Sequence, residues 1–241
     1  MIMTHCGGRI VNFDEVASVP LPQQTNTYIP VGYEDLVVNT KKIADRLLNE
    51  YSFVKDQYAL SGGENKDQRM FAVLQYESTD NPEMGYAIGI RSSYDKSMSN
   101  GFCSGAQIFV CDNLMFRGEV TYMRKHTKNV WNDIEEKTMS TLYKGIDNFQ
   151  NLTSDSEAMK DRTIQKDEAG EFLGRLFING DMTPRQLQKA KKEWFKPSHE
   201  EFNSNTLWGL YNACTESLKT TPPNKILERH ISLHDNAMAL C

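Results

Sequence analysis

The chain has 241 residues, of which 39% are hydrophobic, 10% aromatic and 24% charged, and its formal net charge at pH 7 is −5. This composition is typical of a folded globular protein and excludes both a disordered chain and a uniformly basic nucleic-acid coat protein. Because residues 1–120 carry 15 acidic against 10 basic residues, and residues 121–241 carry 17 of each, a surface that binds polyanions is expected in the second half.

The first 30 residues predict an N-terminal arm that lies on the body of the protein. They are rich in polar and turn-forming residues and contain few apolar ones. From residue 34 to about residue 49, apolar side chains recur at the three- and four-residue spacing of a helix. We therefore expect an arm over 1–30 and then a helix.

Four strand-like runs follow that helix, at 51–60, 68–77, 83–93 and 105–113. Segments rich in turn-forming residues separate them, which is typical of an antiparallel meander. In the second run apolar residues occupy both alternating faces, with Met70 and Leu74 on one and Phe71 and Val73 on the other. This run is therefore expected to be a central strand that helices cover on both sides.

After residue 131 the spacing of apolar residues is helical to the C-terminus. Helices are predicted over roughly 131–162, 167–178 and 184–195, from about residue 205, and after residue 223. The third of them begins at Pro184, which takes the first helical position, and the residue before it, Thr183, is a typical N-cap.

The expected fold class is α+β. An antiparallel meander sheet of about four strands occupies the region 31–120, and flanking helices pack on it. The region 121–241 is expected to be helical and to pack on the same sheet.

The helix predicted from residue 184 has two distinct edges. Its basic edge consists of Arg185, Lys189, Lys192 and Lys196. Its apolar edge consists of Leu187, Ala190 and Trp194. Because neighbouring like charges repel, a phosphate backbone is a natural ligand for the basic edge. A solvated face whose lysine stems cover apolar surface explains the same pattern.

A second basic cluster lies between the sheet and the long helix, with aromatic residues among the basic ones. Its members are Tyr122, Arg124, Lys125, Lys128 and Trp131, with His126 among them. Cations for phosphates and flat rings for bases are what single-strand binding uses. The alternative is a loop leading into a helix, with its aromatic residues in the core.

The loop at 91–97 is dense in polar groups where a strand ends in a turn. Such a loop can bind an anion. Hydrogen bonding of Ser and Asp side chains to the local backbone explains the same composition without a ligand.

No catalytic signature is found in the sequence. Neither a GxSxG motif nor a phosphate-binding glycine loop is present. His230 and His234 are four residues apart, but the spacing fixes no third metal ligand, and we interpret them as exposed surface residues. We therefore expect a non-enzymatic protein with no catalytic residue, metal site or cofactor.

The five cysteines form no CxxC pair, and no run of about 18 apolar residues is present. Apolar neighbours around Cys103 and Cys111 predict buried, inert thiols. These features favour a reduced, cytoplasmic protein that is not associated with a membrane.

Two segments, GYAIGIRSSYDKSMSNGFCSGAQIFVCDNLMF (85–116) and NTLWGLYNACTESLK (205–219), carry a family resemblance. They resemble the phage/plasmid-like proteins of domain of unknown function 932. The matching positions are Arg91, Ser93, Tyr94, Asp95 and Lys96 in the turn, and Val110, Cys111, Asn113 and Leu114 after it. Many members have His where this chain has Tyr94. The resemblance covers roughly residues 30–219, and it implies a mobile genetic element as the setting without assigning an activity.

The leading hypothesis is a nucleic-acid-associated protein of a phage or plasmid that binds single-stranded DNA in replication or recombination. The alternative is a protein-binding factor that inhibits a host defence system, for which the acidic N-terminal half would dock on a basic host surface. The partner is thus nucleic acid or a host protein. Self-association is compatible with both hypotheses, because it would join weak basic surfaces into a continuous track.

Overall fold

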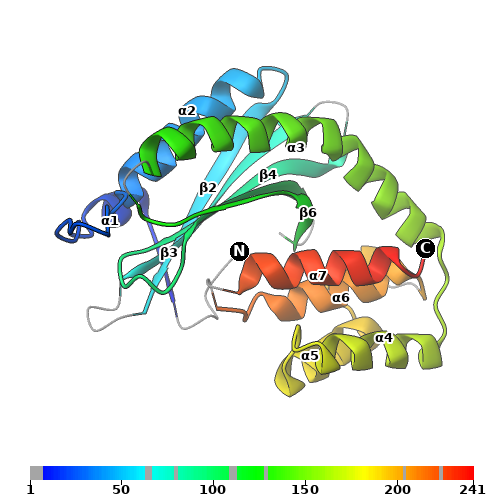
Figure 1. Cartoon of the computed structure of the whole chain (residues 1–241). Coiled ribbons are helices and arrows are strands. Elements are labelled where there is room, and N and C mark those ends of the chain that lie inside the picture. Colours follow the sequence, from blue (N-terminus) through cyan, green and yellow to red (C-terminus); the bar gives the residue numbers. More distant parts are fainter. Residues whose placement is uncertain are drawn as a thin grey trace.

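One antiparallel sheet forms the centre of the molecule, and its spatial strand order is the chain order, β1 to β6. The structure is a computed structural model that describes residues 8–62, 67–78, 81–108, 113–127, 130–202, 205–222 and 225–241. Helices cover both faces of the sheet, and further helices follow in the C-terminal half (Figure 1). The α+β fold with an antiparallel meander is therefore confirmed.

The sheet has more strands than the sequence predicted. The strands are β1 (Arg9–Val11), β2 (Ser52–Ser61), β3 (Arg69–Ser78), β4 (Asn81–Ser93), β5 (Asn100–Ile108) and β6 (Asn113–Arg124). The four predicted runs correspond to β2 to β5, whereas β1 and β6 were missed. Because β6 ends at Arg124, the strands continue past residue 120, where we expected the sheet region to end.

The central strand β3 is buried on both faces, as its sequence predicted. Met70 and Leu74 belong to the main hydrophobic core on one face. Phe71 and Val73 belong to a smaller cluster on the other face, which includes Ile226 and Leu227 from the last helix. Because successive side chains of β3 point to opposite faces of the sheet, this one strand contributes to two separate hydrophobic cores.

Two helices cover the first face, α2 (Tyr33–Leu47) and α3 (Val130–Asp161) (Figure 1). α3 has 32 residues and packs on β5 and β6. At Gly145 it approaches the sheet so closely that an added Cβ would overlap the side chains of Tyr86 and Ser104. The glycine thus sets the distance between this helix and the sheet.

The N-terminal arm contains two short elements, β1 and α1 (Phe13–Ala17). β1 pairs with the second half of β2, and a capping box between Asn12 and Glu15 begins α1. The arm then crosses the body of the protein, where Tyr28 and Val31 are buried.

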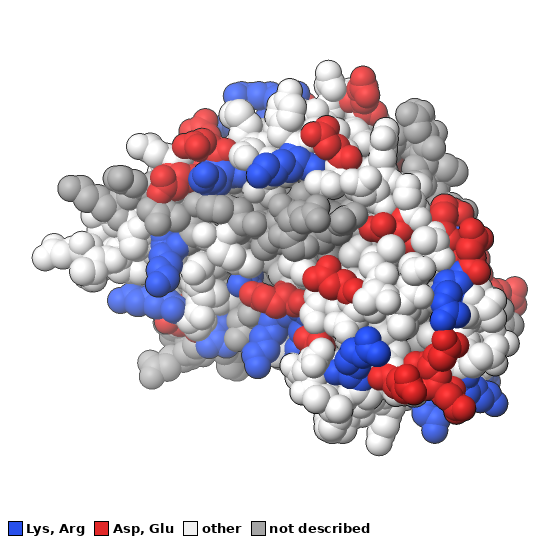
Figure 2. Space-filling model, turned by 45° about the vertical axis from the view of Figure 1, so that its right-hand side comes forward, with Lys and Arg blue, Asp and Glu red and all other residues white. Residues whose placement is uncertain are grey.

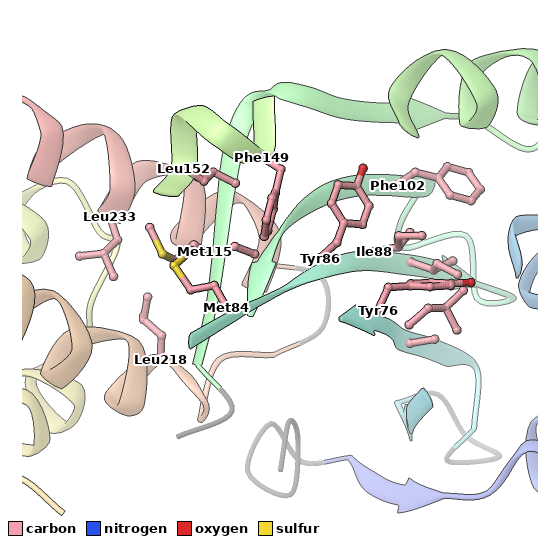
Figure 3. Packing of buried hydrophobic residues seen from close by; sticks show 14 of the residues in the cluster. Tyr76, Met84, Tyr86, Ile88, Phe102, Met115, Phe149, Leu152, Leu218 and Leu233 are labelled. Carbon is pink, nitrogen blue, oxygen red and sulfur yellow. The ribbon is translucent and has the colours of Figure 1, made fainter. Parts of the chain in front are cut away.

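The C-terminal half contains α4 (Lys166–Ile178), α5 (Pro184–Phe195), a 3-10 turn (Glu200–Phe202), α6 (Leu207–Leu218) and α7 (Ile226–Met238). The predicted cap at Thr183 and Pro184 is confirmed, because the Thr183 side chain accepts from the Gln186 backbone N–H. Figure 3 shows buried side chains continuing from Tyr86 in the sheet through Met84 to Leu218 and Leu233 in the C-terminal helices. The sheet and these helices share one core.

Among the helices of the described ranges, none combines the length and apolar character needed to cross a bilayer.

Candidate functional site

The two basic clusters predicted from the sequence lie in different parts of the molecule. α5 packs on α6 at the far end of the C-terminal half, whereas the link from β6 to α3 lies beside the N-terminal arm (Figure 1). Figure 2 shows lysine and arginine side chains interspersed with acidic ones over the face it presents. The clusters do not merge into one surface, so each is described separately.

On α5, one member of the basic edge is neutralised within the protein. The Lys189 ammonium donates to a carboxylate oxygen and to the backbone oxygen of Glu216, each at 3.0 Å. Burial raises the pKa of Glu216, but the bonds from Lys219 and Lys189 outweigh it and lower that pKa overall. The remaining basic side chains, Arg185, Lys192 and Lys196, are exposed. The apolar edge is confirmed: Ala190 is buried, and Leu187 and Trp194 pack against the core.

In the second cluster, only part of the prediction falls in the described structure. The side chains of Tyr122 and Arg124 and the whole of Lys128 lie outside the described residues. Trp131 is half-buried and packs against the core. Core packing therefore accounts for an aromatic residue at this position, and no ligand is needed to explain it. Lys125 is exposed and faces a pocket.

That pocket has a volume of about 330 Å³ and brings together three segments that are distant in the sequence. Its described lining residues are Thr27 and Tyr28 of the arm, Lys96 to Ser99 of the loop between β4 and β5, and Lys125 to Thr127 after β6. No acidic residue is among them. Neither Lys96 nor Lys125 forms an ion pair with a carboxylate in the described part of the chain. We call these residues the basic pocket.

Local hydrogen bonds hold the loop between β4 and β5. The Asp95 carboxylate accepts from the Ser97 backbone N–H at 2.9 Å and from Nε of Arg69 at 2.7 Å. Burial raises the pKa of Asp95, but bonds from Ser97 and Arg69 lower it overall. Lys96 follows in the left-handed region, with φ of 62°. Local bonding thus fixes the loop, and it leaves Lys96 and Ser97 exposed at the pocket.

Tyr94 connects this loop with the rest of the protein. Its ring stacks on Tyr33 with centroids 3.8 Å apart, and its hydroxyl accepts from the Tyr33 backbone N–H at 3.0 Å. The Tyr94 backbone N–H donates to Gln68 at 2.7 Å. These contacts connect the loop with α2 and with the residue that precedes β3.

His126 lines the basic pocket and is only 6% exposed. Its ring lies 5.2 Å from that of Tyr28, and its backbone oxygen accepts from the Ile29 N–H at 3.1 Å. Neither ring nitrogen has a hydrogen-bond partner among the described residues. Burial lowers the pKa of His126, with a partial offset from the nearby Ile29 backbone, so the ring is neutral at pH 7.

Arg91 has a structural partner in α7. Its guanidinium donates to both carboxylate oxygens of Glu228, at 2.7 and 2.6 Å. This bidentate pair attaches the last helix to the second face of the sheet.

The histidines of α7 are buried, and the prediction that they are exposed was wrong. His230 and His234 are 3% and 2% exposed, because both point toward the core. His234 Nε2 lies 3.0 Å from a carboxylate oxygen of Asp155 on α3. No cluster of three His, Cys, Asp or Glu residues that would suit a metal occurs within the described ranges.

Two of the described cysteines, Cys103 and Cys214, are fully buried, and burial raises the pKa of both thiols. The prediction for Cys103 is thus confirmed, whereas Cys111 lies outside the described residues. A raised pKa makes both thiols poor nucleophiles.

Sequence reasoning found parts of the basic pocket separately. It singled out Lys125 and His126 as one cluster and the loop through Lys96 as another, but it missed their proximity. It also missed Thr27 and Tyr28, whose segment carries no charge or motif to mark it.

The comparison with protein families identifies a family model that covers most of the chain. The model described as Domain of unknown function (DUF932) matches residues 31–238. No curated protein and no solved structure matches the chain.

Proposed function

The chain belongs to the family of the Domain of unknown function (DUF932), and because that description assigns no activity, we propose from the geometry that the protein binds nucleic acid through the basic pocket. Binding is non-enzymatic, and the pocket takes a phosphate of the strand. The observation that carries the proposal is the pair of lysines, Lys96 and Lys125, which face one pocket without an acidic lining residue.

The electrostatics of the pocket favour an anion. Two ammonium groups that face one cavity repel each other, and a phosphate between them removes that repulsion and replaces water as the ligand. The hydroxyls of Ser97 and Thr127 add donors at the same place. Such contacts to phosphate are independent of sequence, so binding depends strongly on salt.

Single-stranded DNA is the preferred ligand in this proposal. The pocket is a local recess at the junction of a strand, a loop and the arm, and a flexible strand can place a phosphate in a recess more readily than a stiff duplex. The setting we propose is replication or recombination of a phage or plasmid in the host cytoplasm. Self-association would align several pockets along one strand.

Fluorescence anisotropy with a labelled oligothymidylate and a matched duplex, at about 50 and about 200 mM salt, tests the proposal. The double variant K96A/K125A is expected to bind about tenfold more weakly and to lower the salt slope by about 2, one for each lost phosphate contact. The matched control is K192A/K196A, which removes the same charge from α5 and its C-cap. No binding of wild type at the lower salt, or an equal loss in both variants, would contradict the proposal.

Protein binding is the second candidate function, and exposed apolar side chains on α4 and α5 favour it. Ile178 is 84% exposed, Phe195 54% and Phe177 47%. A factor that inhibits a host defence system would need such a surface. Pull-down from nuclease-treated host lysate, with I178D/F195D as the control, would support this candidate if a stoichiometric partner is captured by wild type alone.

A further inference from the structure

We infer that two copies of the chain pair through the outward face of α4. The inference goes beyond the proposed function, because it uses no residue of the basic pocket and assigns a partner to the exposed apolar side chains of α4. Three properties of this helix support it: apolar side chains that are exposed, charged side chains that complement those of a second copy, and glycines that leave room for a close approach.

α4 has one buried face and one open face. Its buried residues, Ala169, Phe172 and Leu176, belong to the main core. On the opposite face Gly170 and Gly174 lie one turn apart, and a Cβ added to either would meet no atom within 4 Å. Figure 1 shows α4 beside α5 at the end of the molecule away from the sheet. The open face is therefore accessible to another helix.

Two large apolar side chains lie on the open face. Ile178 is 84% exposed and Phe177 47%. They follow Gly174 by four and three residues, so they continue the same side of the helix toward its C-terminus. Exposed apolar side chains that gather on one face are typical of a contact with another protein. We call Gly170, Gly174, Phe177 and Ile178 the outward face.

The charges beside the outward face select a second copy as the partner. Glu171 and Arg175 are exposed, lie one turn apart and flank the same edge of this face. Neither forms an ion pair in the described part of the chain. When two identical helices pack antiparallel about a two-fold axis, equivalent edges lie side by side. Glu171 of each copy then faces Arg175 of the other, so the edge complements itself.

A crossing at Gly174 brings the apolar contacts and the charge pairs together. Two glycines opposite each other allow the helix axes to approach closely. Ile178 and Gly170 lie four residues on either side of Gly174, so in an antiparallel pair Ile178 of one copy lies over Gly170 of the other. The large side chain fills the space that the glycine leaves. In this register the first turn, with Lys166 and Asp167, extends past the end of the partner helix and stays in water.

The size of the face predicts a reversible dimer. α4 has 13 residues, which corresponds to a length of about 20 Å. A pair of such helices buries less surface than a standard interface of about 1,600 Å². We therefore expect a dissociation constant in the micromolar range and an equilibrium between monomer and dimer.

Sedimentation of the intact protein at concentrations from about 1 to about 200 µM tests the inference. Wild type is expected to shift from monomer to dimer over this range, and I178D is expected to remain monomeric. Because Ile178 is exposed, the substitution should leave the circular dichroism spectrum unchanged. The matched control is Y143D, since Tyr143 is also exposed, at 62%, but lies on α3. It is expected to dimerise like wild type.

Charge reversal tests whether the partner is a second copy. E171R or R175E alone places like charges opposite each other and is expected to weaken the dimer about tenfold. The double variant E171R/R175E exchanges the two charges and is expected to return to within about threefold of wild type. A mixture of the two single variants is expected to associate more tightly than either does alone.

Several outcomes would overturn the inference. These are a wild type that remains monomeric at the highest concentration, an I178D variant that dimerises like wild type, and a double variant as weak as the single ones. Capture of a host protein through α4 by a monomeric wild type would assign the face to that protein instead. Binding of oligonucleotides is measured separately, so the failure of either proposal leaves the other standing.

Discussion

At the scale of single residues, the buried His126 couples protonation to stability. Burial lowers its pKa below the ordinary value of 6.5. Below that pH the unfolded chain takes up a proton at this residue, whereas the folded chain takes it up only at a lower pH. The free energy of unfolding therefore falls as the pH decreases from about 7 toward about 5, by at most about 1.4 kcal/mol per pH unit for this proton.

Urea unfolding of wild type and H126Q at about pH 7.5 and about pH 5.5 measures this contribution. Glutamine does not titrate, so the variant is expected to lose less stability between the two values than wild type. The difference between the proteins isolates His126 from the other groups that titrate in the same range. Equal losses in both would show that the ring is protonated in the folded chain.

At the scale of elements, Gly145 sets how closely α3 lies to the sheet. Alanine is the better helix former by about 1 kcal/mol, but at this position its Cβ would overlap Tyr86 and Ser104, both of them buried in the sheet. Gly145→Ala is expected to lower the free energy of unfolding by about 1–3 kcal/mol, because the helix must move away from β4 and β5.

Gly170→Ala is the control for the previous substitution. Gly170 lies in α4, and an added Cβ there meets nothing within 4 Å. Only helix propensity changes, so the substitution is expected to raise stability by about 0.5–1 kcal/mol. Denaturant unfolding of the two variants should show opposite signs. A stabilised Gly145→Ala would mean that α3 is not held against the sheet at this point.

The elements that the sequence predicted are those with strong local patterns. Strand-like runs separated by turn-forming segments predicted β2 to β5. Apolar residues at helical spacing predicted α2 and the helices from α3 onward. β1 has only three residues and is defined by its pairing with β2. β6 contains Arg117, Gly118 and Glu119 in sequence, which is typical of a turn, and the register with β5 shifts at these residues, so the pairing that defines β6 lies on either side of them.

Burial of the later helices was harder to predict than their positions. The spacing of His230 and His234 was compatible with either face of α7, and only packing on α3 and α6 decides that both are buried. Likewise, Lys189 had the spacing of a solvated residue, but Glu216 on α6 pairs with it. Partners that are distant in the sequence determine these outcomes.

At the scale of the whole molecule, the candidate site exists only because the chain folds back on itself. The arm supplies Tyr28, the loop after β4 supplies Lys96, and the loop after β6 supplies Lys125 and His126. The spacing of residues within each segment contains no information about the other two. Local sequence reasoning therefore finds the charged groups but not the pocket, its volume or the buried ring.

The shared core predicts that the whole chain unfolds in one step. α6 is buried along nearly its whole length, α3 spans from the sheet to the C-terminal helices, and α7 covers the second face of the sheet. Neither the sheet nor the helical half can bury its apolar surface without the other, so we expect a single cooperative transition despite the change from strands to helices along the chain.

Two probes distinguish one transition from two. Trp131 lies in α3, which packs on the sheet, so the probe is a Trp131→Phe variant, in which the remaining Trp194 and Trp208 lie in α5 and α6 and their fluorescence reports on the C-terminal helices. Amide hydrogen exchange at β3 reports on the sheet, because its backbone is paired on both sides. The free energies from the two probes are expected to agree within about 1 kcal/mol, since both sense the global opening. A sheet that remains protected after the tryptophans have become exposed would mean that the region before residue 125 folds as a domain of its own.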